Sequence, residues 1–145
     1  MNTKMILGGI VGGVVSFLLG WVVFGILLEP YYTSNMVEYS GSGLVRAEAD
    51  MHLWAIAVAQ FAWSFLLAWI FSKWGGINAM KGFVNGFIIF LLVTTGFDLF
   101  MYAQFNLYKG TFYLVDIAVN AVFGGIVGAV IGMVMGMPMK KATTL

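Results

Sequence analysis

The chain has 145 residues, of which 61% are hydrophobic and 9% are charged, and its formal net charge at pH 7 is +1. A water-soluble domain carries about 25% charged residues, so this composition excludes one. The small net charge gives no reason to expect a nucleic-acid partner. The absence of cysteine excludes disulfides, thiolate metal sites and thiol redox chemistry by the chain itself.

Four long apolar runs dominate the sequence, at residues 7–28, 53–72, 82–104 and 112–137. Each has about the 20 residues that a helix needs to cross a bilayer core. A β-barrel would alternate apolar and polar positions, whereas runs such as GFIIFLLVTTGF are apolar on every side. We therefore predict an all-α protein, a single domain of residues 1–145 with four transmembrane helices in an antiparallel bundle. Short connections predict that the second and third helices, and the third and fourth, are neighbours.

The first run, 7–28, is too long for the apolar core of a cleaved signal peptide, so we expect it to be retained. Small residues recur at every fourth position in this run and again in the last one. They are Gly8, Gly12, Ser16 and Gly20, and then Gly124, Gly128, Gly132 and Gly136. Small residues at this spacing let two helix backbones approach closely in lipid. Such a glycine zipper packs either within the bundle or between two protomers, and the sequence leaves both alternatives open.

The stretch GGIVGGVVSFLLGWVVFGILLEPYY resembles the first helix of small bacterial four-helix membrane proteins of unknown function. The resemblance covers this helix and the layout of four crossings. It implies the same fold and a location in a bacterial inner membrane. It brings no catalytic residue and no cofactor to the chain.

Residues 29–51 form a long and acidic connection, which we expect to be an outer loop. Pro30 follows the last turn of the first run, where proline readily stops a helix. Near the end of the connection, Glu48, Asp50 and His52 fall within five residues. Such a set can bind a divalent cation, although its spacing matches no zinc motif. The alternative is that these are solvated residues that lead into the second helix.

Two acids lie inside the later apolar runs. Asp98 is about 10 Å below the outer end of the third helix, and Asp116 is about 8 Å below that of the fourth, at a rise of about 1.5 Å per residue. An aspartate in the membrane costs about 2.5 to 3.5 kcal/mol, so it usually faces the bundle interior or a wet cavity. Because a short connection joins the two helices, we expect both acids at similar depth on adjoining helices.

Other polar side chains are spaced to lie near these acids. Thr94 and Tyr102 flank Asp98 at four residues on either side, Asn120 follows Asp116 by one turn, and Gln60 reaches a similar depth from the second helix. The predicted ligand-binding residues are therefore Asp98, Asp116, Tyr102, Asn120, Gln60 and Thr94.

The two acids differ in their position relative to the helix dipole. Asp116 is near a helix N-terminus, whose dipole favours an acid, but Asp98 is in the C-terminal half of its helix, where the dipole opposes one. Asp98 therefore needs a donor, such as Tyr102 or Thr94, or a proton of its own. Two acids that are close together in a low dielectric share a proton or attract a cation.

Basic residues are distributed unevenly between the two predicted membrane faces. One face holds Lys4, Lys73, Lys81, Lys140 and Lys141 without any acid, and the other holds Arg46 and Lys109. The positive-inside rule therefore places both termini in the cytoplasm.

Two functions fit these observations. The first is binding or transport of a small cation, a proton or a polar solute through an outer-leaflet polar pocket, in which case a conduction path would need a second protomer. The second is a structural or accessory membrane subunit without a ligand. An enzyme is a weaker alternative, because no nucleophile is paired with a base at a telling spacing. The expected partners are the lipid bilayer and either another copy of the chain or another membrane protein.

Overall fold

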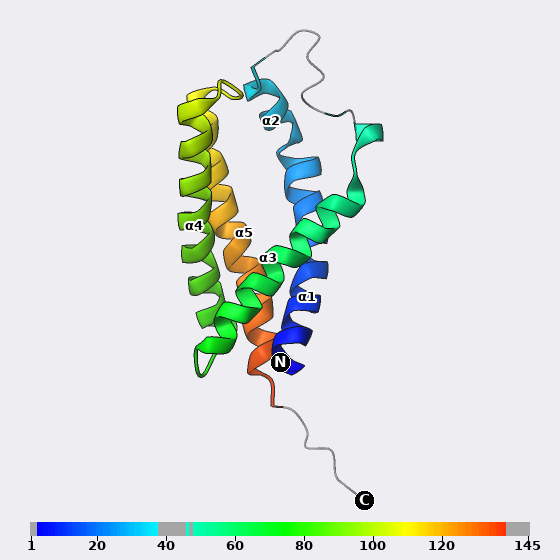
Figure 1. Ribbon diagram of the computed structural model, residues 1–145, viewed down its shortest axis with the longest axis vertical. Coiled ribbons are helices and arrows are strands. Elements are labelled where there is room, and N and C mark those ends of the chain that lie inside the picture. Colours follow the sequence, from blue (N-terminus) through cyan, green and yellow to red (C-terminus); the bar gives the residue numbers. More distant parts are fainter. Residues whose placement is uncertain (1–2, 38–45, 47, 139–145) are drawn as a thin grey trace, which may run out of the picture.

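The computed structural model describes residues 3–37, 46 and 48–138, and this part of the chain is helical without any β-strand (Figure 1). The first helix begins as an α-helix and ends as a π-helix. The elements in chain order are α1 (Thr3–Gly20), η1 (Trp21–Leu27), α2 (Glu29–Asn35), η2 (Glu48–Asp50), α3 (Leu53–Lys73), α4 (Ala79–Gln104) and α5 (Gly110–Gly136).

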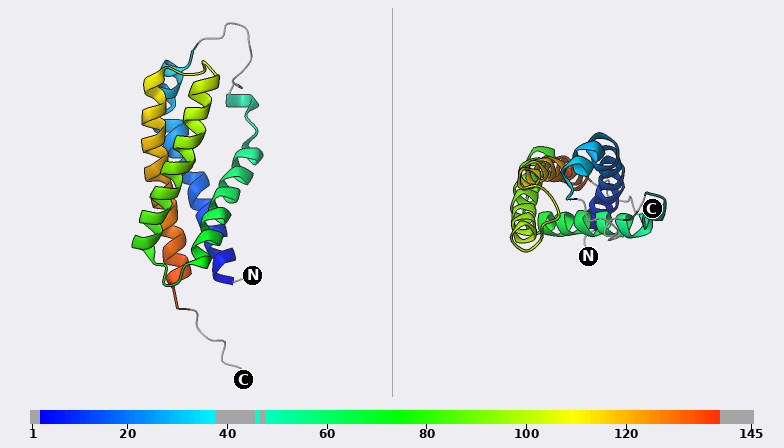
Figure 2. Two further views of the ribbon diagram at one scale, coloured as in Figure 1. Left: turned by 60° about the vertical axis from the view of Figure 1, so that its left-hand side comes forward. Right: turned by 90° about the horizontal axis from the view of Figure 1, so that it is seen from above.

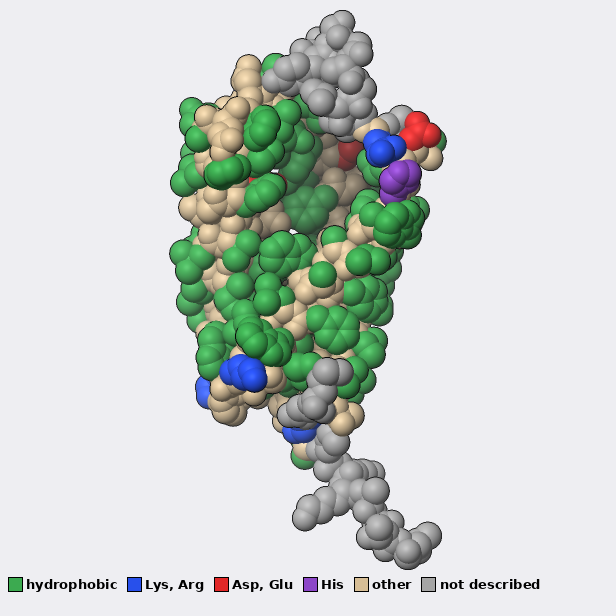
Figure 3. All heavy atoms as spheres, viewed as in Figure 1, with side chains coloured by type: hydrophobic (Ala, Val, Ile, Leu, Met, Phe, Trp, Pro, Cys, Tyr) green, Lys and Arg blue, Asp and Glu red, His purple; other side chains and the backbone are tan. Residues whose placement is uncertain are grey.

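Four helical stretches among the described residues are long and apolar enough to cross a membrane. They are Thr3–Leu27, Leu53–Ser72, Ala79–Gln104 and Gly110–Gly136, which confirms the four predicted spans to within a few residues at each end. Large apolar side chains are exposed on several helices, for example Leu27 at 67%, Leu92 at 66% and Leu114 at 70%. Hydrophobic side chains cover the middle of the molecule in Figure 3. Such a surface is characteristic of a protein that contacts lipid.

The helices α4 and α5 pack side by side along their length (Figure 2). A Cβ atom added at Gly82 would lie 2.1 Å from the carbonyl oxygen of Gly128, and one at Gly86 would lie 2.2 Å from that of Gly124. Only glycine permits two backbones to approach this closely, as small residues do at helix contacts in membranes. The contact fixes the register of the two helices as far as the end that carries α2 and the acids, which we call the outer end.

The helix α1 packs against α3 and α5. Cβ atoms added at Gly9 and Gly13 would lie 2.5 Å and 2.4 Å from the rings of Phe65 and Phe61 of α3, and one at Gly12 would lie 2.5 Å from a side chain of α5. Members of both predicted stripes also contact other helices of the same chain: Gly8 and Gly12 meet α5, and Gly124 and Gly128 meet α4. The buried apolar core comes from α3 and α5 and consists of Leu67, Ala68, Phe71, Phe123, Val127, Ile131 and Met135.

The prediction that the second and third spans are close neighbours is wrong for most of their length. The helices α3 and α4 meet near the connection that joins them and diverge toward the outer end (Figure 1). The extensive contacts of α3 are with α1 instead. The reason is that the glycines of α4 face α5, whereas Gly9 and Gly13 offer α3 a close approach to α1. The space-filling view shows the surface hollowed in the outer half (Figure 3).

The predicted outer loop, 29–51, begins with a helix rather than with irregular chain. The first span ends at Leu27, and α2 then begins at Glu29 with Pro30 in its first turn. Proline is tolerated there because the first turn of a helix leaves its N–H groups without intrahelical partners. Pro30 therefore marks the start of a second, short helix as well as the end of the first span.

Candidate functional site

The register of α4 and α5 brings Asp98 and Asp116 together. Each step of four residues along α4 matches a step of four back along α5, because Gly82 meets Gly132 and Gly86 meets Gly128. The same register, continued outward, places Asp98 opposite Asp116. The Asp98 carboxyl group lies within hydrogen-bonding reach of Asp116. The two acids therefore lie at similar depth on adjoining helices, as expected, and they face each other, which the sequence had left open.

Asp98 is almost completely enclosed, with 6% of its surface exposed. Its Oδ2 atom is buried and has no hydrogen-bond partner among the described residues. An ionised carboxylate has only acceptor atoms. Two carboxyl groups in contact therefore need a hydrogen or a cation between them.

Asp116, in contrast, receives a donor at each carboxylate oxygen. The Tyr32 hydroxyl donates to Oδ1, and the Asn120 amide donates to Oδ2 at 2.9 Å and to the Asp116 main-chain carbonyl at 3.0 Å. Both carboxylate oxygens of Asp116 therefore already act as acceptors within the chain.

Tyr32 reaches Asp116 because α2 is attached to the connection between α4 and α5. We call residues 29–37 the outer strap. The Val37 amide donates to the Leu107 carbonyl at 2.9 Å, and the Lys109 amide donates to the Asn35 carbonyl at 3.0 Å. The Lys109 ammonium group also donates to the Ser34 carbonyl at 2.9 Å. These bonds hold the strap across the outer end of the two helices.

Aromatic rings surround the Tyr32 hydroxyl. The Tyr32 ring meets Phe112 edge-on with a centroid distance of 4.8 Å, and Tyr108 stacks on Phe112 at 3.9 Å. Burial, followed by the hydrogen bond to Asp116, raises the pKa of Tyr32 above its ordinary value. Burial and the nearby Asp116 charge raise the pKa of Tyr108 in the same direction. Both phenols therefore remain hydrogen-bond donors at neutral pH.

Neither donor suggested for Asp98 bonds to it among the described residues. Tyr102 is 58% exposed and packs edge-on against Tyr113 at a centroid distance of 5.4 Å. Thr94 is half-buried and lies one helical turn inward of Asp98 on the same helix. The need of Asp98 for a donor or a proton is therefore not met by these two side chains.

Gln60 bonds to α1 rather than to the acids. Its side-chain oxygen accepts a hydrogen bond from the Ser16 hydroxyl, and a Cβ atom added at Gly20 would lie 3.2 Å from its side-chain nitrogen. Ser64, one turn further along α3, is fully buried and its hydroxyl has no partner among the described residues. Because α3 leans away from α4, its polar residues form a separate group at the contact with α1.

The candidate metal residues of the outer connection do not gather into a site within the described part of the chain. Asp50 is exposed at the end of η2, and His52 lies beside the Trp54 ring at a centroid distance of 6.5 Å. The side chain of Glu48 lies outside the described residues. Where side chains are described, no three of His, Cys, Asp or Glu are grouped so that they could hold a metal ion.

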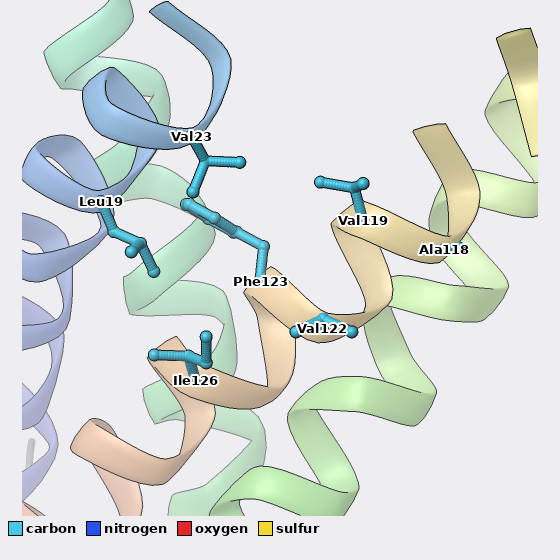
Figure 4. Close-up of a pocket in the computed structure, with 7 residues that line it drawn as sticks. All are labelled: Leu19, Val23, Ala118, Val119, Val122, Phe123 and Ile126. Carbon is cyan, nitrogen blue, oxygen red and sulfur yellow. The ribbon is translucent and has the colours of Figure 1, made fainter. Parts of the chain in front are cut away.

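The cleft in Figure 4 is a different feature from the acidic pair. It has a volume of about 310 Å³ and opens between the first span and α5. It is lined by Leu19, Val23, Ala118, Val119, Val122, Phe123 and Ile126. All of these side chains are apolar, so the cleft suits hydrocarbon and not a polar solute.

The functional residue that the sequence analysis missed is Tyr32. The pair Tyr31 and Tyr32 after Pro30 has the composition of an interfacial aromatic belt. The helix α2 and its attachment to the connection between α4 and α5 bring Tyr32 to Asp116.

The chain matches no protein-family model, no curated protein and no solved structure. What the site does is therefore inferred from its geometry.

Proposed function

We propose that the chain is an integral protein of a bacterial inner membrane that binds a proton or a small cation at Asp98 and Asp116, as a step in transport. The observation that supports this most directly is the buried carboxyl group of Asp98. Its Oδ2 atom has no partner among the described residues, and the group lies within hydrogen-bonding reach of Asp116. An isolated charge is costly in the membrane, and intramembrane acids commonly mark the paths of ions and protons.

The proposed orientation has both termini in the cytoplasm and the outer strap on the opposite face. Lys4, Lys73 and Lys81 belong to the end where α1 begins, whereas Arg46 and Lys109 belong to the end that carries the strap. Blue side chains at the lower end of the molecule in Figure 3 illustrate the first group. The positive-inside rule then assigns the lower end to the cytoplasm.

A path across the whole bilayer requires more than the acidic pair. Toward the inner end, α4 and α5 are in backbone contact at Gly82 and Gly86, which leaves no space between them. The proposed path therefore follows the hollow of the outer half or a contact with a second protomer.

The test is the substitution Asp98→Asn in proteoliposomes that contain the purified full chain. An internal pH-sensitive dye and ion-flux measurements report uptake when a proton gradient or a gradient of Na⁺ or K⁺ is imposed. We expect Asp98→Asn to abolish the uptake that the wild-type chain supports. Glu29→Gln is the matched control, since Glu29 is an exposed acid that accepts only a local hydrogen bond from Thr33 at 2.9 Å. If Asp98→Asn left both binding and uptake unchanged, the proposal would be refuted.

A structural or accessory subunit is the second candidate, and one observation favours it. Both carboxylate oxygens of Asp116 accept hydrogen bonds within the chain, so this acid also fastens the outer strap. Purification from the native membrane, followed by mass spectrometry of the proteins that accompany the chain, tests this candidate. A stoichiometric membrane partner would support it, and a homo-oligomer without partners would count against it.

A further inference from the structure

We propose that the acidic pair holds a single proton, carried by Asp98 and shared with Asp116, and that Tyr32 and Asn120 position Asp116 as its acceptor. This inference rests on the proposed function and names the occupant of the same site.

The hydrogen bonds of the pair distinguish its two members. Each oxygen of Asp116 already accepts from a side chain of the protein, Oδ1 from Tyr32 and Oδ2 from Asn120. Asp98 has no such donor at Oδ2. Because both Asp116 oxygens already act as acceptors, we assign the hydrogen that the contact requires to Asp98.

The proton is conserved within the pair. The Asp98 O–H group donates to a remaining lone pair of an Asp116 oxygen, because a carboxylate oxygen can accept more than one hydrogen bond. If the proton crosses, the Asp98 O–H bond breaks, an Asp116 O–H bond forms, and Asp98 becomes the carboxylate. The pair carries one negative charge in both arrangements, so the crossing adds no charge to the membrane interior.

Among the described residues, two phenols lie close enough to Asp116 to interact with it. Tyr32 of the strap donates to it, and Tyr108 of the connection between α4 and α5 lies near its charge. Tyr113 of α5 packs edge-on against Tyr108. The ammonium group of Lys109 donates to the Ser34 carbonyl of the strap. None of the hydrogen bonds or ion pairs recorded for the described residues brings a lysine or arginine to either acid. A proton therefore balances one of the two charges.

A metal ion fits the same geometry poorly. Calcium and magnesium take roughly six or more oxygen ligands, and the described residues supply no third carboxylate beside the pair. The groups nearest to Asp116, the Tyr32 hydroxyl and the Asn120 amide, direct hydrogens toward its oxygens. A cation would have to displace these donors before it could use the same lone pairs.

The test is infrared spectroscopy of the full chain in lipid nanodiscs at neutral pH. We expect the carbonyl stretch of a protonated carboxylic acid, with a shift on exchange into D₂O. The band should disappear in Asp98→Asn and remain in Glu29→Gln. It should change frequency in Tyr32→Phe, because the acceptor loses one of its own donors. Addition of NaCl, KCl, MgCl₂ or CaCl₂ should leave the band unchanged.

Three results would overturn the inference: no such band in the wild-type chain, a band that persists in Asp98→Asn, or a band that any of these salts removes. If Asp98→Asn fails to fold by circular dichroism, Asp98→Glu replaces it, and an unchanged band in that variant also counts against the inference. Calorimetric titration with the same salts distinguishes failure of the proton assignment from failure of the proposed function. Metal binding that requires Asp98, without a protonated band, refutes the proton and retains the proposed function. The absence of both refutes the two together.

Discussion

The hydrogen bond from Tyr32 to Asp116 can be removed with little other change by the substitution Tyr32→Phe. The phenyl ring would keep its edge-on contact with Phe112 at a centroid distance of 4.8 Å and its contact with Phe24 at 6.0 Å. Only the hydroxyl group is lost. We therefore expect the outer strap to remain in place but to open more often.

The magnitude follows from the type of bond. A hydrogen bond to a charged group contributes about 1.5 to 3 kcal/mol, and a loss of about 2 kcal/mol changes an equilibrium by about 30-fold. Strap opening should therefore increase by roughly that factor. The strap should not detach completely, because the amides of Val37 and Lys109 still bond across it at 2.9 Å and 3.0 Å.

Hydrogen–deuterium exchange in nanodiscs measures this opening, because both of those amides become exchangeable only when the strap leaves the connection between α4 and α5. We expect both amides to exchange about 30-fold faster in Tyr32→Phe than in the wild-type chain. The matched control is Tyr31→Phe, since the Tyr31 ring stacks near Phe112 at 6.3 Å and makes no hydrogen bond to the acidic pair. Unchanged exchange in Tyr32→Phe, or equal acceleration in Tyr31→Phe, would refute the role given to this hydroxyl.

Three further predictions concern packing, a buried polar contact and pH. Gly128→Ala places a Cβ atom 2.3 Å from a backbone carbonyl oxygen of α4. We expect the free energy of unfolding in detergent to fall by about 1 to 3 kcal/mol. The control Gly96→Ala, whose Cβ atom would have nothing within 4 Å, should leave it unchanged. Gln60→Leu removes the acceptor of the Ser16 hydroxyl and should cost about 0.6 kcal/mol, and at most about 1.7; a loss above 3 kcal/mol would point to a larger role for this pair. Folding raises the pKa of Tyr32 above 10.0. The stabilisation of the strap by the Tyr32 hydroxyl should therefore be complete below pH 10.0 and decline as the pH rises above it. Strap exchange should therefore accelerate above about pH 10 in the wild-type chain and less so in Tyr32→Phe, and identical pH profiles would contradict this assignment.

Several features could be predicted from the sequence because they depend on local composition. The four spans follow from runs of apolar residues, which need only to be long enough for the bilayer. The similar depth of Asp98 and Asp116 on adjoining helices followed from their positions and the short connection, whereas their contact is known only from the structure. Both arguments use distance along one helix or between two helices that are joined directly.

Other features depended on which helix faces which, and the pattern of apolar residues carries little information about that. Spans that are apolar on every side have no polar face to mark their orientation. Tyr102 and Thr94 were suggested as donors to Asp98 beside the alternative of a proton, and neither bonds to it among the described residues. Gln60 was grouped with the acids, but its side chain bonds to Ser16. The same ambiguity led to the wrong pairing of the second and third spans.

Four candidate membrane spans and two acids near one end of the last two spans follow from the order of the residues alone. The fold was needed to show that Asp116 is bonded by Tyr32, which is 84 residues away, and that Gln60 bonds to Ser16, which is 44 residues away. The physical reason is that close packing at glycines sets the helix pairs in lipid, where hydrophobicity does not distinguish one face from another. Those helix pairs then determine which polar groups meet and leave Asp98 beside an acid that already has its donors.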